Sequence, residues 1–254
     1  MTMSYDQGAD VYHRVMAPIL AGARRPLLEA SPYDGVRSIL DIGTGPGLLL
    51  RELRALCPTA LIVGVDLSSK MLALASKDFP LARMDANHLA FRDSSFEGAF
   101  MSFVLTSFPH PDKCLREAKR VLREGGFLGT ATWQARESEA LRQWVSVLDE
   151  AGASPVEDRS EVADEPAKIV KLLDEAGFTE TRSWTSSFSF TLEASDFMAL
   201  RTKLGMSAQR LKSIPAETRA KLIREFENRL KKLSVDERTE KALAVLSTST
   251  VRSP

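Results

Sequence analysis

The segment ILDIGTGPGLLL, residues 39–50, constrains the fold of this chain more than any other stretch. An apolar run ends at Ile42, three of the next five residues are glycine, and leucines at helical spacing follow. Glycines reach positive φ and leave the backbone bare, and the helix after such a turn offers free N–H groups. The pattern therefore predicts a strand, a tight turn and a helix against which a ligand can lie.

Strands and helices are expected to alternate along the first half of the chain. Short β-rich runs are expected as strands at 36–43, 60–68, 81–86, 96–105 and 125–133. Helical spacing falls before and between them, at 8–30, 46–58, 68–77 and 111–124. This order is typical of βαβ units in a doubly wound, mostly parallel sheet, an α/β fold. Further on, the pattern predicts helices near 137–151, 164–176 and 195–235, and strands at 178–192 and 242–251.

Charge and composition exclude several classes of function. Lys plus Arg and Asp plus Glu balance at 34 each, so we expect no nucleic-acid partner, although basic residues outnumber acidic ones by 13 to 7 from residue 195 onward. No apolar run is long enough for a membrane span and no secretory signal is readable, so a cytoplasmic protein is expected. Cys57 and Cys114 lack metal-site spacing, and no metal is expected.

Three acidic residues stand at the ends of three successive predicted strands: Asp41, Asp66 and Asp85. A carboxylate in the place of Asp66 can accept hydrogen bonds from two ribose hydroxyls, and Asp85 can accept one from an adenine amino group. Asp41 would repel the pyrophosphate of a dinucleotide. An adenosine joined to a cationic sulfonium fits these acids better, although the glycine pattern alone also suits a nicotinamide dinucleotide.

Four segments in order then resemble the motifs of class I S-adenosylmethionine-dependent methyltransferases: ILDIGTGPG, VGVDLSSKMLALA, MDANHLAFRDSSFEGAF and CLREAKRVLREGGFLGTATW. The nearest branch contains the ubiquinone and menaquinone biosynthesis enzymes and other small-molecule methyltransferases, and the likeness covers about residues 36–133. It implies a seven-stranded sheet with an antiparallel last strand, a helical cap inserted before that strand, and S-adenosylmethionine as cofactor.

The resemblance also assigns residues to the two ends of the cofactor. Gly43, Gly45 and Gly47 would lie along its methionine and ribose, with Asp41 orienting the loop or meeting the amino group. Asp66 would bind the ribose, and Tyr12 would close over the cofactor from the first helix. The residues assigned to adenine are Leu67 and Met71 at its faces, Asp85 and Ala86 at its polar edge, and the carbonyl of Phe103 at its amino group.

The catalytic residue is not identified by the sequence. Where related sequences often carry a histidine, this chain has Thr106 and Ser107. His13 and His110 are the remaining candidates, and His88 is expected to be solvated in a polar loop. Methyl transfer from a sulfonium is an in-line displacement, so alignment and exclusion of water can supply much of the rate.

The acceptor is expected to be a small, partly apolar metabolite that accepts the methyl group on O, N or C. Its candidate pocket residues are Phe108, Trp133, Phe197, Met198 and Met206. We expect a lid at 1–30, the cofactor-binding core at 31–194, a cap at 195–235 and a returning strand at 236–254. The oligomeric state, monomer or homodimer, is left open.

Two other functions remain open on the residues alone. An NAD-dependent oxidoreductase would use the same layers, but a GxGxxG turn would need glycine where Leu48 stands. A cyclase or a non-catalytic binding subunit would keep the cofactor pocket and form no S-adenosylhomocysteine.

Overall fold

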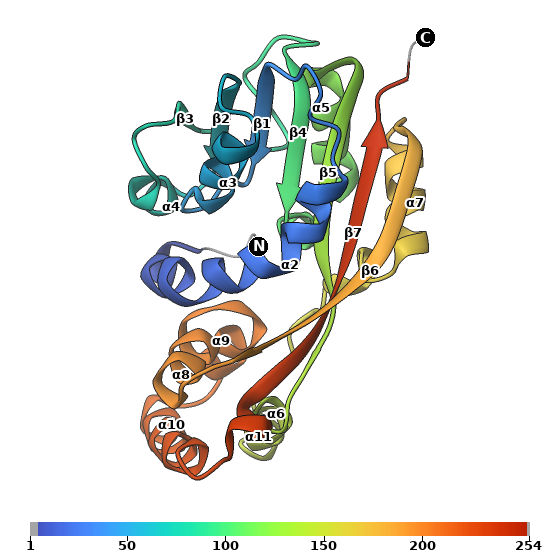
Figure 1. Cartoon of the computed structure of the whole chain (residues 1–254). Helices are drawn as coiled ribbons and strands as arrows, with labels where there is room; N and C mark the ends of the chain where they lie inside the picture. The colour runs from blue at the N-terminus through green and yellow to red at the C-terminus, as the bar shows by residue number, and fades with distance from the viewer. Residues whose placement is uncertain (1–4, 253–254) are drawn as a thin grey trace.

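A seven-stranded sheet forms the centre of the molecule (Figure 1), in a computed structural model that describes residues 5–252. Its strand order is β3-β2-β1-β4-β5-β7-β6. β7 is antiparallel to both of its neighbours, and the other pairs are parallel, as predicted. The first four residues of the predicted lid and the last two of the returning segment lie outside the described residues. The strands are β1 Ser38–Ile42, β2 Leu61–Asp66, β3 Leu81–Arg83, β4 Phe96–Ser102, β5 Leu122–Glu137, β6 Thr179–Thr191 and β7 Thr239–Thr250.

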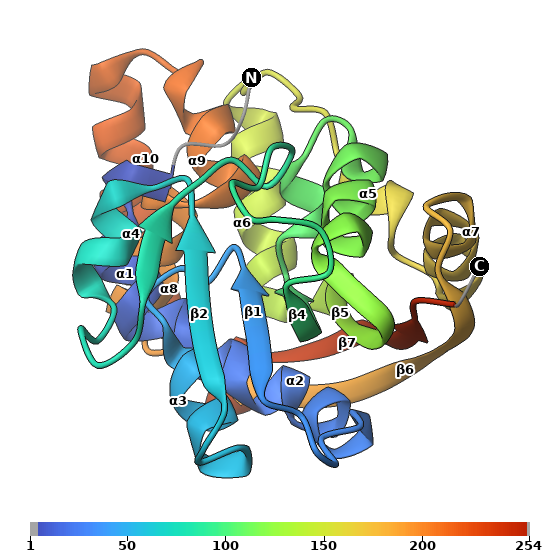
Figure 2. The same ribbon diagram turned by 90° about the horizontal axis from the view of Figure 1, so that it is seen from above.

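Helices cover both faces of the sheet (Figure 2). On one face α2 and α3 pack apolar side chains such as Leu27 and Leu53 against Ile39 of β1. On the other face, α5 and α7 pack against Leu40 and its neighbours. A central strand buried on both faces needs apolar side chains in both directions, which β1 supplies at Ile39, Leu40 and Ile42 but not at Asp41. The main core helices are α2 Ala17–Ala30, α3 Leu48–Leu56, α4 Ser69–Leu74, α5 Pro111–Val121 and α7 Pro166–Glu175.

β5, β6 and β7 continue beyond the core as a long three-stranded ribbon (Figure 1). β5 pairs with β7 as far as Glu137 with Lys241, and β6 pairs with β7 as far as Thr191 with Thr239. The predicted strands at 125–133 and 242–251 were too short at the ribbon end. The reason is that QARE, residues 134–137, is polar, and its β structure comes from pairing with β7.

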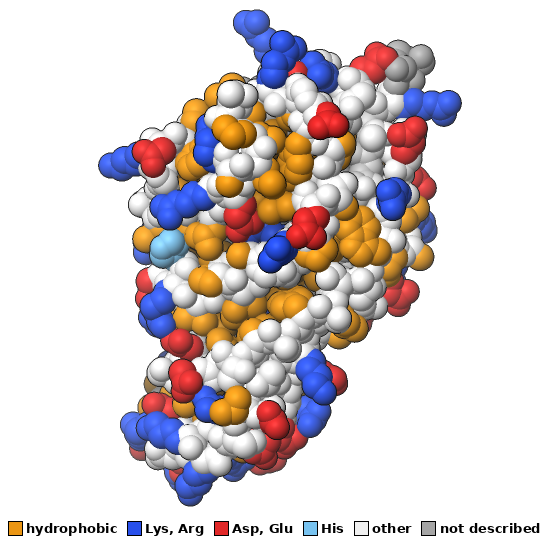
Figure 3. All heavy atoms as spheres, viewed as in Figure 1, with side chains coloured by type: hydrophobic (Ala, Val, Ile, Leu, Met, Phe, Trp, Pro, Cys, Tyr) orange, Lys and Arg blue, Asp and Glu red, His pale blue; other side chains and the backbone are white. Residues whose placement is uncertain are grey.

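A second lobe is built on this ribbon from α6 and the helices of the predicted cap. Its apolar core includes Trp144, Phe197 and Phe226. Helix α6 therefore belongs to this cap lobe, although the predicted boundaries placed it with the core segment 31–194. Figure 3 shows apolar atoms exposed across the middle of one face, and charged side chains crowding the far end of the cap lobe. The helices are α6 Glu139–Glu150, α8 Ala194–Lys203, α9 Gly205–Lys212, α10 Ala216–Leu230 and α11 Val235–Arg238.

The N-terminal helices lie between the two lobes. After a 3-10 turn, Tyr5–Gln7, helix α1, Ala9–Val11, continues through a π-helical turn, Tyr12–Met16, into α2. Arg24 of α2 forms a two-pronged ion pair with Glu52 of α3, at 2.9 and 2.7 Å. Arg14 pairs with Asp196 of α8. The segment is thus tied to both lobes. Among residues 5–252, no helix is long and apolar enough to cross a membrane.

Candidate functional site

The glycine turn after β1 has the backbone conformation that its sequence predicts. Gly43 has φ of 77°, and a Cβ built there would lie 2.6 Å from Cγ2 of Val104. Gly47 has φ of 76° and caps α3, and its Cβ would lie 2.9 Å from Cβ of Ala75. Both positions therefore exclude a side chain by conformation and by space.

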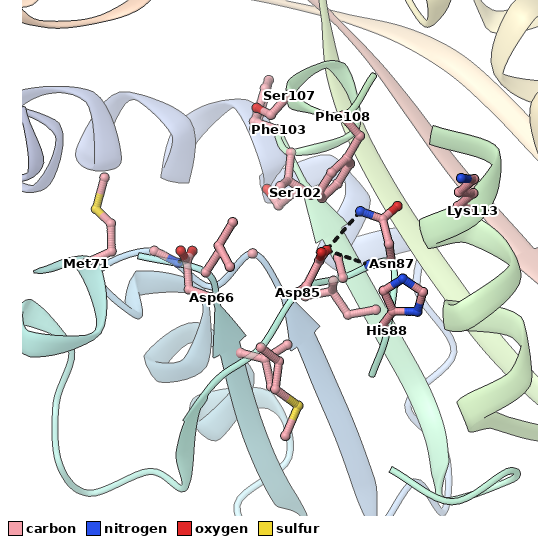
Figure 4. A pocket seen from close by; sticks show the side chains of 18 of the residues that line it. Asp66, Met71, Asp85, Asn87, His88, Ser102, Phe103, Ser107, Phe108 and Lys113 are labelled. Carbon is pink, nitrogen blue, oxygen red and sulfur yellow. Dashed lines mark hydrogen bonds between the residues drawn. The ribbon is translucent and has the colours of Figure 1, made fainter. Parts of the chain in front are cut away.

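A cavity of about 350 Å³ opens over the carboxyl ends of the parallel strands (Figure 4). This size falls in the usual range for small-ligand pockets, and the place is where open α/β sheets bind ligands. The residues predicted to bind the cofactor that line it are Tyr12, Gly43, Gly45, Asp66, Leu67, Met71, Asp85, Ala86 and Phe103. Residues from the turn, from β2 and from β4 therefore meet in one space.

Asp66 is fixed at the end of β2 by two backbone donors. The N–H of Gly45 donates to its Oδ2 at 2.9 Å, and the N–H of Ser68 donates to its Oδ1 at 2.8 Å. Burial raises the pKa of Asp66, while these hydrogen bonds act in the opposite direction. A carboxylate oxygen accepts more than one hydrogen bond, so each oxygen keeps capacity for a ligand in the cavity. Asp66 thus presents a rigid pair of acceptors.

Asp85 lies further along the cavity, on the loop after β3. Its Oδ1 accepts hydrogen bonds from the backbone N–H and the side-chain amide of Asn87, at 2.9 and 2.8 Å (Figure 4). Ala86 is buried beside it, and Met71 is buried on the far side of Asp66. Leu67 is half exposed. This part of the cavity wall thus combines apolar side chains with a carboxylate that Asn87 holds in place.

Asp41 does not line the main cavity, and neither does Gly47. The Asp41 side chain faces a second space of about 20 Å³, which shares Tyr12, Gly43 and Ser102 with the main cavity. Within the described residues, Ser102 Oγ is buried there without a hydrogen-bond partner, and the Thr44 hydroxyl faces the Asp41 carboxyl. Burial raises the pKa of Asp41 to about 7. A space of this size with several polar walls suits one water molecule.

Phe103 adopts an unusual conformation at the end of β4. Its φ is 57°, which is rare for a bulky residue and costs energy of about 1–3 kcal/mol. Its backbone N–H donates to the carbonyl of Ala131 at 2.7 Å, and its ring lies 4.8 Å from that of Trp133. The bend thus lies in the cavity wall, which Phe103 lines. Sequence reasoning missed Met84, Ser102, Val104 and Ser107, which also line the cavity; the hydroxyl at a strand end was the available signal for Ser102.

The five candidate acceptor residues are not brought together. Phe108 lines the cavity, and Trp133 packs behind Phe103. Phe197 and Met198 do not line the cavity, because they are buried in the apolar core of the cap lobe. Met206 is exposed on α9 and lies outside the cavity.

The two candidate bases lie in different places. His110 lines the cavity, at the end where His88 and Lys113 also lie. His13 does not line it, and its Nδ1 is buried without a hydrogen-bond partner among residues 5–252. In that same part of the chain, no three His, Cys, Asp or Glu side chains gather so that they could hold a metal ion.

The strand order, the glycine turn and the acid at the end of β2 together define a nucleotide-binding α/β protein of the doubly wound class. Residues 40–130 match the family described as methyltransferase domain. Residues 40–130 thus form an S-adenosylmethionine-dependent methyltransferase domain, and the relatives that match this part of the chain include methyltransferases of quinone biosynthesis.

Curated proteins resemble the chain over part of its length. A demethylmenaquinone methyltransferase of Thermotoga maritima is 37% identical over 105 residues, which are 40% of this chain and 44% of that protein. The chain spans about half the length of the curated relatives it matches.

Solved structures share the fold at low sequence identity. A phosphoethanolamine N-methyltransferase 2 of Haemonchus contortus, solved with S-adenosylhomocysteine, matches at a TM-score of 0.57 and 16% identity, over 98% of this chain and 58% of that one. The [4+2]-cyclase SpnF matches at a TM-score of 0.53 and 20% identity, over 99% of this chain and 98% of that one.

Proposed function

We propose that the protein transfers the methyl group of S-adenosylmethionine to O, N or C of a small, partly apolar metabolite. The observation that carries the proposal is Asp66. Its carboxylate is held by Gly45 and Ser68 and faces a cavity whose walls come from the methyltransferase segment, apart from Tyr12. An acid in this position suits two ribose hydroxyls, and Asp41 beside the glycine turn would repel the pyrophosphate of a dinucleotide.

The residues present fit this cofactor. The bare backbone at Gly43 and Gly45 leaves room for its amino-acid part, and Ser102 Oγ is a buried hydroxyl without a partner in the described chain. Asp66 would hold the ribose, and Leu67, Met71, Asp85 and Ala86 would surround the adenine. When bound, S-adenosylmethionine supplies a methyl group made electrophilic by its sulfonium.

The chain's own contribution is to align the acceptor and exclude water. Tyr12 lines both cavities, and its helix is tied to the core through Arg24 and to the cap lobe through Arg14. A closed lid of this kind suits a displacement that depends on orientation. For an acceptor that must lose a proton, we propose His110 over His13, because only His110 lines the cavity.

The same proposal includes a small molecule as the methyl acceptor and the cytoplasm as the location of the protein. Cys57 and Cys114 are both free and buried, in keeping with a reducing compartment.

Product analysis tests the proposal. The protein is incubated with S-adenosylmethionine carrying a labelled methyl group and with a panel of phenols, amines and quinols, and S-adenosylhomocysteine is measured by mass spectrometry. A methylated acceptor with an equal amount of S-adenosylhomocysteine is expected. Tight cofactor binding with an acceptor converted and no S-adenosylhomocysteine formed would instead support the cyclase alternative.

A further inference from the structure

Three charged side chains meet where the ribbon enters the cap lobe. Glu240 of β7 is fully buried and accepts a hydrogen bond from the guanidinium of Arg201 on α8. Arg136 of β5 lies on its other side, with Nε 3.6 Å from Glu240 Oε2. Arg201 is nearly buried, and the Arg136 side chain is 19% exposed. One acid thus faces two arginines.

Arg136 is the more weakly paired of the two arginines in this cluster. Glu240 is engaged by Arg201, and across residues 5–252 the guanidinium of Arg136 donates no hydrogen bond. Burial lowers the pKa of Arg136 to about 10, and repulsion by Arg201 outweighs attraction by Glu240. Arg136 is still a cation at neutral pH. A partly buried cation with only one long ion pair gains stability when a second anion completes its environment.

An aromatic surface connects Arg136 with the cavity. The Phe103 ring, which lines the cavity, lies 4.8 Å from Trp133, and the guanidinium carbon of Arg136 lies 4.9 Å from the Trp133 ring centre. Phe188 of β6 lies 5.8 Å from Trp133 and pairs with Ala242, as Arg136 does, so both project from the same face of the ribbon. A row of aromatic rings thus runs from the cavity wall at Phe103 to Arg136, whose described ion pair with Glu240 is long and carries no hydrogen bond.

We propose that Arg136 binds an acidic group of the methyl acceptor, and that the acceptor is a flat aromatic or conjugated acid lying along Phe103 and Trp133. This inference rests on the proposed function and adds to it the chemical class of the substrate. The carboxylate balances the charge of the cluster and accepts hydrogen bonds from the terminal N–H groups of Arg136, while the face of the guanidinium stays on Trp133.

Binding of aromatic acids and their neutral amides tests the inference. The probes are 4-hydroxycinnamate and 2-naphthoate with their carboxamides, titrated by calorimetry into the full chain with and without S-adenosylhomocysteine. We expect the wild type to bind each acid at least tenfold more tightly than its amide. In R136Q this preference is lost, and in R136K, which keeps the charge but not the flat stacked group, it is reduced.

The controls separate this inference from the proposed function and from a structural role. Arg142→Gln, on the exposed side of α6 in the same lobe, should keep the preference for the acid. S-adenosylhomocysteine affinity should be unchanged in R136Q; no affinity in the wild type would contradict the proposed function instead. Equal binding of acid and amide, binding of neither, or a preference that persists in R136Q would overturn the inference. So would R136Q losing S-adenosylhomocysteine binding together with its folded state, which would make Arg136 a structural residue.

Discussion

The backbone N–H of Gly45 donates a 2.9 Å hydrogen bond to the carboxylate of Asp66, so the turn after β1 and the end of β2 form one rigid unit. This bond joins the glycine motif to the acid that we assign to the ribose. Asp66 therefore has two roles in the account, since it also holds the backbone of the glycine turn.

Asp66→Ala should lower the affinity for S-adenosylmethionine by about tenfold or more while the fold survives, because two charge-assisted hydrogen bonds to the ribose are lost. Calorimetry gives the affinity and circular dichroism reports the fold. Asp78→Ala, at an exposed loop position, is the matched control. Unchanged affinity in the Asp66 variant would remove the ribose assignment.

Gly43→Ala should destabilise the protein by more than the roughly 1–2 kcal/mol that a left-handed conformation costs an ordinary residue. The excess comes from the clash with Val104. Gly35→Ala isolates the conformational part, because Gly35 has φ of 71° and no atom within 4 Å of its added Cβ. Urea unfolding compares the two variants. Equal losses of unfolding free energy in the two variants would show that Val104 moves aside and that the predicted clash is absent.

Asp41→Asn should stabilise the protein at high pH and lose this advantage as the pH falls. The folded-state pKa of Asp41 is raised to about 7, so between about 4 and 7 the native state holds a proton that the unfolded state has released. The contribution of Asp41 to the unfolding free energy of the wild type therefore falls as the pH rises from about 4 to 7. Urea unfolding at pH 5, 6, 7 and 8 measures the difference, with the exposed Asp34→Asn as control. A difference that does not change with pH would contradict the assignment.

Glu240→Gln should cost about 3–5 kcal/mol of unfolding free energy, because it leaves two arginines without their shared counter-charge. Glu225→Gln, in an exposed pair with Lys221 on α10, should cost less than about 1 kcal/mol. Chemical denaturation compares the two. A small loss at Glu240 would mean that solvent already screens the cluster.

The sequence predicted the core fold because its signals are local. The apolar run before Gly43 and the acids at the ends of three successive strands depend on neighbours within a few residues. The number of strands and the antiparallel last strand came from the family resemblance, and the structure confirms both.

Features set by distant contacts were missed. The positive φ of Phe103 depends on Ala131, and the extension of β5 depends on β7. Phe197 and Met198 were expected at the acceptor site, but an apolar helix residue fits a cap core as well as a pocket, and here the cap core holds them. The cluster at Glu240 joins three distant segments that no local pattern links.

The most direct test of the central claim is calorimetric titration of the purified protein with S-adenosylmethionine, S-adenosylhomocysteine and NAD in parallel. The account predicts micromolar binding of both adenosyl compounds and none of NAD. Binding of NAD alone would contradict it.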